Sequence, residues 1–388
     1  MKVLFWSSLV LIVYTYVGYP LILWSVSRVY RKRIEKNKQY LPQVSIVMTA
    51  FNEEKYIAAK LNNLLNLNYP ADHLEILVGS DGSQDGTDRI ISEQFSRQVR
   101  FFPFVTNSGK PRVLNDLVQE SRGEILVLTD ARQEFDRDAV RALVQNFNDP
   151  KVGSVSGELL FKEHDHAAVG KGMDLYWRYE KFLRRCESDL GSMLGATGAI
   201  YAARRELFTP FPPDILVDDM YLPFAIIRKG FRAVFEPEAM AYDIVSAKGE
   251  QEFKRKVRTL SGNYQVFQHF PDLFNPFRSP VAFQLFSHKF MRLMIPFLML
   301  AAAVSNLLLV RQSLYAWIFA LQGLFYGLAG AEWKAQLDGA GKSTAKKKRG
   351  IGYIAYTFCL LNYSALVGFI YFFTGRQKVT WDKAYGSI

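Results

Sequence analysis

Hydrophobic positions divide the chain into a central part with short apolar runs and longer apolar spans on either side. Residues 3–26 carry no charge and are long enough to cross a bilayer. Residues 280–292 are amphipathic and suited to a membrane surface, and further apolar spans follow them. These patterns predict a membrane anchor over 1–28, a globular domain over 42–248, a basic interfacial segment over 249–292, membrane helices over 293–375 and a tail over 376–388.

The central domain alternates short apolar runs with stretches whose apolar residues recur at helical spacing. The short runs predict strands at 44–49, 74–78, 99–105 and 125–129. The longer periodic stretches predict helices at 53–67, 88–95 and 111–119. Because strand and helix alternate, we expect an α/β domain of the doubly wound, Rossmann-like type, with a parallel sheet covered by helices on both faces.

The net charge of +11 does not indicate nucleic-acid binding, because much of the excess lies beside the apolar spans, at 28–38 and 342–349. Basic residues in such places set membrane topology or contact anionic lipids. The bias places the N-terminus outside and the central domain in the cytoplasm, as in a multi-pass inner (plasma) membrane protein. Three full crossings after the domain would put the tail, with Arg376, outside. Either the charge rule fails there, or one apolar segment is re-entrant or interfacial.

The positions of the cysteines and the charges argue against disulfide-stabilised proteins, thiol enzymes and transporters. Cys186 and Cys359 are far apart and have no metal-ligand spacing, so neither a disulfide framework nor a catalytic thiol is expected. A transporter or channel is also disfavoured, because no charge inside the apolar spans marks an ion path.

Acidic residues recur where the predicted strands end. Glu53 follows the first strand, Asp81 follows the second, Asp130 closes the strand at 125–129, and the pair Asp218 and Asp219 follows the apolar run 215–217. Each alone has an ordinary explanation as a turn or helix-capping residue. Several carboxylates at strand ends of one sheet are harder to explain by capping, because open α/β sheets bind ligands at that edge.

The segments 44–53, 80–83, 109–115, 129–132 and 217–219, taken in order, resemble family 2 glycosyltransferases. The resemblance is to the membrane-bound branch that includes cellulose, hyaluronan and poly-N-acetylglucosamine synthases. It implies a GT-A-like fold and an inverting enzyme that transfers a sugar from a nucleotide donor, with UDP expected, to a growing polysaccharide. The alternative is a non-processive transferase that adds one sugar to a lipid-linked (polyprenyl) acceptor. Membrane lipids and export or accessory proteins are the further partners implied.

The resemblance also implies roles for individual residues. Asp219 would be the general base, with Asp218 as the second candidate, and Asp130 would ligate Mg²⁺ or Mn²⁺, which prefer hard oxygen ligands. The nucleotide sugar would be held by Ala50, Asn52, Glu53, Asp81, Lys110, Asp130 and Arg132. The acceptor or the diphosphate would meet Gly195, Thr197, Lys256 and Arg258. The plain alternatives are a solvated lysine at 110, a loop of small residues at 191–199 and a membrane-surface basic helix at 254–258.

Two positions depart from the family pattern. Arg132 stands where the metal motif usually has a second acid, so the metal would have one protein carboxylate fewer. Thr259 stands where processive members usually carry a tryptophan that stacks on the acceptor sugar. Processive polymerisation is therefore less firmly implied than sugar transfer itself.

Overall fold

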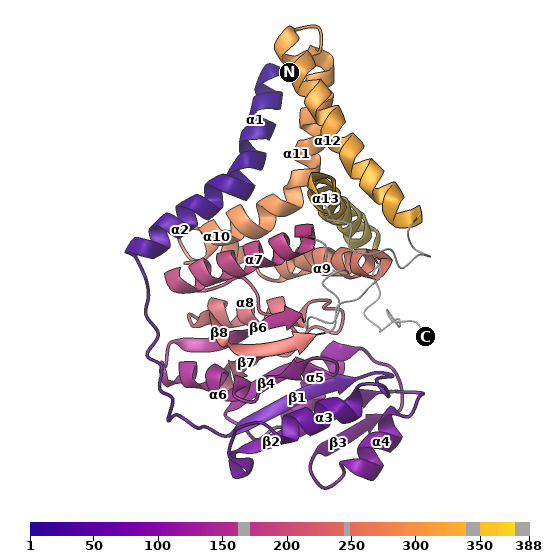
Figure 1. Cartoon of the computed structure of the whole chain (residues 1–388). Helices are drawn as coiled ribbons and strands as arrows, with labels where there is room; N and C mark the ends of the chain where they lie inside the picture. Colours follow the sequence, from indigo (N-terminus) through magenta and orange to yellow (C-terminus); the bar gives the residue numbers. More distant parts are fainter. Residues whose placement is uncertain (162–170, 244–248, 339–349, 377–388) are drawn as a thin grey trace.

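The computed structural model describes residues 1–161, 171–243, 249–338 and 350–376. A globular domain lies beneath a group of long helices, with two further helices between them (Figure 1). The basic segment predicted at 342–349 and residues 377–388 of the predicted tail lie outside the described residues.

Eight strands of the described part form one sheet in the order β3-β2-β1-β4-β7-β6-β8-β5. Their bounds are β1 Val44–Ala50, β2 Leu74–Asp81, β3 Arg100–Phe104, β4 Ile125–Asp130, β5 Glu134–Phe135, β6 Val152–Phe161, β7 Tyr201–Arg204 and β8 Arg232–Asp243. The first four are parallel neighbours, which confirms the prediction made from alternating strands and helices. The second half is mixed, because β7 pairs antiparallel with both β4 and β6. The predicted parallel pairing thus holds for these four strands and does not extend to the second half of the sheet. Only two residues form β5, and no helix separates it from β4, so the strand–helix alternation on which parallel pairing depends stops there.

Helices cover both faces of the sheet, as the alternation predicts. They are α3 Ile57–Leu65, α4 Thr87–Gln94, α5 Lys110–Glu120, α6 Ala139–Val144 and α8 Asp218–Arg228, with 3₁₀ turns at Ala71–His73, Gln145–Asn148, Arg205–Leu207 and Pro271–Phe274. Val47 of β1 packs into one core with α5 and α8, whereas Ile46 and Met48 pack into the other with α3, α4 and α6. Alternate residues of a central strand thus fill opposite cores.

The acids differ in the elements that carry them. Asp81 and Asp130 end β2 and β4, and Glu53 follows β1, so these three lie at the carboxyl ends of adjacent strands, as predicted. The expectation of a strand before Asp218 was wrong, because residues 215–217 form no strand and Asp218 is the first residue of α8. The pair therefore reaches this edge from a helix N-terminus.

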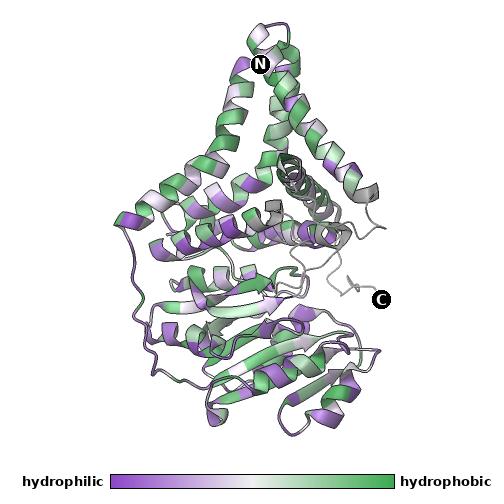
Figure 2. Cartoon of the chain, viewed as in Figure 1, coloured by the Kyte–Doolittle hydropathy of each residue, from purple (hydrophilic) through white to green (hydrophobic). Residues whose placement is uncertain are grey.

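Four helices within the described residues are long and apolar enough to cross a membrane, which makes this a membrane protein by length and composition. They run over Lys2–Val29, Ala282–Leu309, Ser313–Ala335 and Ile351–Thr374. The first contains α1 Lys2–Val13, a π-turn Tyr14–Gly18 and α2 Tyr19–Val29. The second contains α10 Ala282–Gln284, a π-turn Leu285–Phe290 and α11 Met291–Leu309, so the amphipathic segment continues directly into the span. The others are α12 Ser313–Asp338 and α13 Ile351–Thr374. Hydrophobic residues predominate along all of them (Figure 2).

Helices α7 Lys171–Leu190 and α9 Gly249–His269 lie between the sheet domain and the membrane helices (Figure 1). Two glycines let α9 approach its neighbours closely. A Cβ on Gly262 would lie 2.9 Å from a methyl of Val217, directly before the Asp218–Asp219 pair. A Cβ on Gly368 of α13 would lie 3.1 Å from the backbone nitrogen of Ser261. Helix α9 is therefore packed between a membrane helix and the segment that carries the two acids.

Candidate active site

A buried lysine joins two of the predicted acids. The Nζ of Lys110 lies 2.9 Å from Oδ1 of Asp130 and 3.0 Å from Oδ1 of Asp218. Gly109, with a φ of 90°, makes the turn that starts α5 at Lys110. Burial opposes the charged amine, but the two carboxylates outweigh it and raise the pKa of Lys110 above its ordinary value. The alternative of a solvated loop lysine was therefore wrong.

Asp218 and Asp219 have different surroundings. Asp218 is buried, and its second oxygen accepts a hydrogen bond of 2.8 Å from the Tyr201 hydroxyl. Asp219 is half-buried and accepts a hydrogen bond of 3.0 Å from the backbone N–H of Gly198 at Oδ2. Both oxygens of Asp218 are thus engaged within the protein, whereas Asp219 keeps the carboxylate better placed to meet a ligand.

The protonation of Asp219 is tuned by its neighbours. Burial raises the pKa of Asp219 to about 6, the negative charges of Asp218 and Asp130 act in the same direction, and Lys110 opposes them. A carboxyl with this pKa is mostly ionised at pH 7 and is a stronger base than an exposed aspartate. Gly198 leaves space between the acids, because a Cβ there would lie 3.4 Å from Asp219 Oδ2 and 3.8 Å from Asp130 Oδ2.

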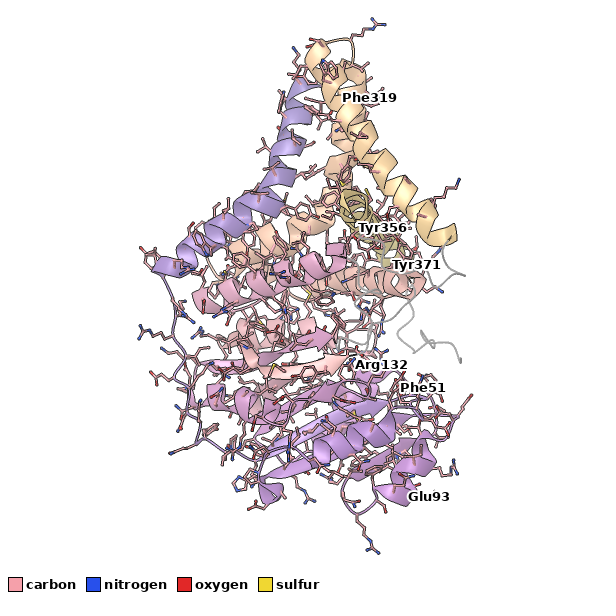
Figure 3. All side chains as sticks on the ribbon, in the orientation of Figure 1. Phe51, Glu93, Arg132, Phe319, Tyr356 and Tyr371 are labelled. Carbon is pink, nitrogen blue, oxygen red and sulfur yellow. The ribbon has the colours of Figure 1, made fainter. Side chains whose placement is uncertain are left out.

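Glu53 and Arg132 form a second charged group beside Asp130. Burial raises the pKa of Glu53 to about 7, although the positive charge of Arg132 opposes the shift. The guanidinium of Arg132 lies 3.6 Å from Asp243, which also accepts a hydrogen bond of 2.9 Å from Gln133. Arg132 and Phe51 lie toward the same edge of the domain (Figure 3).

The loops after β1 and β2 are joined by hydrogen bonds. The Asn52 N–H donates to the Ser83 hydroxyl at 3.0 Å, the Gln84 N–H donates to Asn52 Oδ1 at 2.7 Å, and the Glu53 N–H donates to Thr87 Oγ1 at 2.8 Å. Asn52 has a φ of 56°, a left-handed conformation that asparagine tolerates better than most residues. These bonds hold the backbone of both loops in one arrangement.

Two predicted residues beside these loops are buried. Asp81 accepts backbone hydrogen bonds from Ser108 at 2.7 Å and Gly109 at 2.9 Å, so its carboxylate holds the loop that leads to Lys110. Ala50 is buried at the end of β1 and offers no polar side-chain group. A direct contact of either residue with a nucleotide stays a prediction.

Of the remaining predicted residues, some lie farther toward the membrane helices, and the others contribute through their backbone rather than their side chains. The Nζ of Lys256 lies 4.7 Å from the ring centre of Tyr176 and 4.9 Å from that of Trp177, both in α7. Arg258 has a buried Nε without a hydrogen-bond partner among the described residues. The Thr197 N–H donates to the Ser156 hydroxyl at 3.1 Å. Gly195 has a φ of 104°, which favours glycine at that turn.

One residue with a clear place at the site was missed by the sequence reasoning. Lys60 is 1% exposed, and its Nζ donates to Thr129 Oγ1 at 3.0 Å and to the Gln133 carbonyl at 2.5 Å. It therefore holds both ends of the loop that carries Asp130 and Arg132. The signal was present, because Lys60 interrupts the apolar face that Ile57 begins on its helix.

Comparisons with known proteins agree with this geometry. Residues 45–209 match the family model described as "Glycosyl transferase family 2". The chain is 27% identical over 270 residues to "Probable glycosyltransferase YdaM" of Bacillus subtilis (strain 168), covering 65% of this chain and 62% of that protein. It is 24% identical over 241 residues to "Poly-beta-1,6-N-acetyl-D-glucosamine synthase" of Staphylococcus aureus (strain COL), covering 61% and 58%. The matches thus span about three-fifths of the length of these relatives.

A solved structure shares the fold over nearly the whole chain. It is the mannosyltransferase PcManGT from Pyrobaculum calidifontis in complex with GDP-Man and Mn²⁺, with a TM-score of 0.73 and 22% identity. The likeness covers 96% of this chain and 100% of that one, and it supports a GT-A fold. Residues 45–209 are therefore similar to the family 2 glycosyltransferases, and the fold carries Asp130, Lys110 and the Asp218–Asp219 pair to one edge.

Proposed function

We propose that this protein transfers a sugar from a nucleotide-sugar donor, with UDP as the expected nucleotide, to a glycan acceptor at the membrane. The proposal rests on one observation. The ammonium group of Lys110 is bonded to both Asp130 and Asp218, and Asp219 lies beside them. This arrangement provides a cation for a diphosphate and an ionised carboxylate for an acceptor hydroxyl. The match of residues 45–209 to the family 2 glycosyltransferase model supports the same reaction class.

In this proposal the donor lies across the carboxyl ends of β1, β2 and β4. Lys110 and Arg132 face the negative charge of the diphosphate, and the loops at Asn52 and Glu53 hold the nucleoside. Fixed charges of this kind stabilise the negative charge that develops on the departing diphosphate. Asp81 supports the site by fixing the loop before Lys110.

Asp219 acts as the base in this proposal. It accepts the proton of the acceptor hydroxyl as the oxygen attacks the anomeric carbon from the face opposite the diphosphate, so the configuration inverts. The carbon–oxygen bond to the diphosphate breaks as the new glycosidic bond forms. Asp218, fixed by Lys110 and Tyr201, holds the first turn of α8 and keeps Asp219 in position.

A divalent cation fits this site through a single protein ligand. Within the described residues, no group of three or more His, Cys, Asp or Glu side chains could hold a metal ion alone. Mg²⁺ commonly binds one or two carboxylates together with substrate phosphates, and Asp130 has an oxygen, Oδ2, that is not bonded to Lys110. Asp130 would therefore hold Mg²⁺ or Mn²⁺ with the donor, where the ion would neutralise diphosphate charge.

The acceptor is first proposed to be a growing polysaccharide. The named synthase among the relatives supports this role, and the candidate membrane helices support a multi-pass protein of the inner (plasma) membrane with its catalytic domain in the cytoplasm. The second candidate is addition of a single sugar to a lipid-linked acceptor. Thr259 favours it, because a threonine cannot provide the aromatic face on which a translocating sugar chain would stack.

Release of nucleoside diphosphate from a panel of nucleotide sugars tests the proposal. Purified full-length protein in lipid nanodiscs would be assayed with Mg²⁺, with Mn²⁺ and with chelator. We expect one donor to be preferred and Asp219→Asn to lose nearly all release while its unfolding temperature stays near that of the wild type. Full activity of Asp219→Asn would refute the assigned base. Product sizing separates the two acceptors, because only polymerisation gives a ladder of long chains.

A further inference from the structure

Buried polar residues fill the seam between α7 and the membrane helices. Glu187 of α7 is 1% exposed and accepts a hydrogen bond of 2.9 Å from the Tyr19 hydroxyl of α2. The same carboxylate oxygen lies 2.6 Å from Nδ1 of His288, in the π-turn before α11. Glu180 pairs with Arg292 of α11. The acids on this face of α7 therefore have partners from two different membrane helices.

Two cations of the seam have no such partner. The side chains of Arg184 and Lys289 form no hydrogen bond or ion pair with any described residue, and both are half-buried. Arg184 follows Glu180 by four residues and precedes Glu187 by three, so all three lie on one face of α7. Lys289 directly follows His288, whose ring is bonded to Glu187, so Lys289 lies beside the same helix as Arg184.

The acids that act on these cations are already engaged. Glu187 and Asp219 are the carboxylates whose charges act on both Arg184 and Lys289. Glu187 is bonded to Tyr19 and His288, and Asp219 is held by Gly198. A half-buried cation without a bonded counter-ion is less well solvated than one in water. Among the residues that the structure describes, the seam therefore has two cations without a bonded anion.

Hydrogen bonds connect the seam to the candidate base. The Leu194 N–H donates to the second oxygen of Glu187 at 3.4 Å, and two residues later the Ala196 N–H donates to the Asp219 carbonyl at 2.7 Å. On the membrane side, Phe283 and Phe286 belong to the same helix as Lys289 and are 51% and 49% exposed. Exposed apolar side chains thus precede Lys289 on its own helix, and hydrogen bonds lead from Glu187 through residues 194–196 to Asp219.

We propose that Arg184 and Lys289 bind the phosphate or diphosphate group of a lipid-linked acceptor, whose hydrocarbon chain lies along the helix of Phe283 and Phe286. The sugar hydroxyl to be extended then faces Asp219. The inference rests on the proposed function and narrows its acceptor, whether one sugar or a growing chain is attached to the lipid. The donor diphosphate is a different ligand, because Lys110 is bonded to Asp130, which ends β4 at the edge of the sheet.

Lipid binding tests the site without any turnover. The full-length protein in nanodiscs of phosphatidylcholine would be titrated with a fluorescent polyprenyl phosphate, and with the corresponding neutral polyprenol. We expect the wild type to bind the phosphate at least about tenfold more tightly than the alcohol. Arg184→Gln and Lys289→Met should each weaken phosphate binding about tenfold, the loss expected for one charge-assisted hydrogen bond. Arg184→Lys, which keeps the charge, should lose less.

Arg185→Gln is the matched control, because Arg185 is the exposed neighbour of Arg184 on the same helix. Equal loss in Arg184→Gln and Arg185→Gln, or no loss in Arg184→Gln, would overturn the proposal. Displacement of the probe by a nucleoside diphosphate would instead assign the cations to the donor, and equal displacement by phosphatidylglycerol would make them a general anionic-lipid contact. Both results would also overturn it. Because no donor is added, selective binding can be found even where no nucleotide sugar is turned over, and the two proposals fail separately.

Discussion

Lys110 offers the most direct test of the site, because its ammonium group is bonded to two carboxylates and its charge acts on a third. Replacing it with methionine keeps most of the volume of the side chain and removes its charge. Asp218, Asp130 and Asp219 would then face one another without the ammonium group that joins two of them. We expect Lys110→Met to destabilise the folded protein and to raise the pKa of Asp219, which Lys110 now lowers.

The size of the effect follows from burial. The side chains of Lys110 and Asp218 are 11% and 10% exposed, and removing one partner of a buried pair costs about 3–5 kcal/mol. The side chain of Asp130 is 33% exposed, so its bond to Lys110 adds no more than about 1 kcal/mol. The deficit should be largest near pH 8, where all three acids are ionised. It should shrink toward pH 5, because the raised pKa of Asp219 lets that carboxyl take up a proton and relieves the repulsion.

Unfolding temperatures in nanodiscs between pH 5 and pH 8 would measure the deficit. The double variant Lys110→Met/Asp218→Asn removes one of the unpaired charges and should recover part of the loss at pH 8. A single variant as stable as the wild type at pH 8 would refute this account. So would a deficit that does not change with pH, or a double variant no more stable than Lys110→Met.

Three further predictions concern the same edge of the sheet. The acid limb of the pH profile of kcat/KM should have an apparent pKa near 6, the value for Asp219, and a limb at pH 4 would contradict that assignment. Gly198→Ala should fold normally, because its methyl would lie 3.4 Å from Asp219 Oδ2. Its activity should still fall at least about tenfold, because the methyl fills the space beside Asp130. An unchanged rate would contradict this. Lys60→Met should raise the KM for the donor several-fold, because it releases the loop that carries Asp130. Lys55 is exposed, so Lys55→Met should leave this KM unchanged. Equal effects of the two variants in a donor titration would contradict the role of Lys60.

Local patterns were sufficient for the parts of the site that lie directly after strands. An apolar run followed by Glu53, Asp81 or Asp130 places the acid at a strand end, and adjacent parallel strands bring such ends together. The apolar run before Asp218 gave the same signal, but there it fills the core around α8. Short apolar runs do not distinguish a strand from other buried segments.

Contacts between distant segments could not be predicted in the same way. The bond between Lys110 and Asp218 joins residues more than a hundred positions apart, and it depends on how α5 and α8 pack on one face of the sheet. The seam is a similar case, because Glu187 meets Tyr19 and His288 only after three parts of the chain have assembled. Neither arrangement has a local pattern that would have revealed it.

The close packing of α9 has a practical consequence for anyone who wishes to study the catalytic part alone. Val217 packs against Gly262 on one side of this helix, while Gly368 from the last membrane helix packs against Ser261 on the other. A truncated protein ending near residue 248 would lose both contacts, and the backbone before Asp218 and Asp219 would face water. Removing the spans would therefore loosen the two acids even though no catalytic residue had been deleted, and a soluble fragment without activity would say little about the intact enzyme.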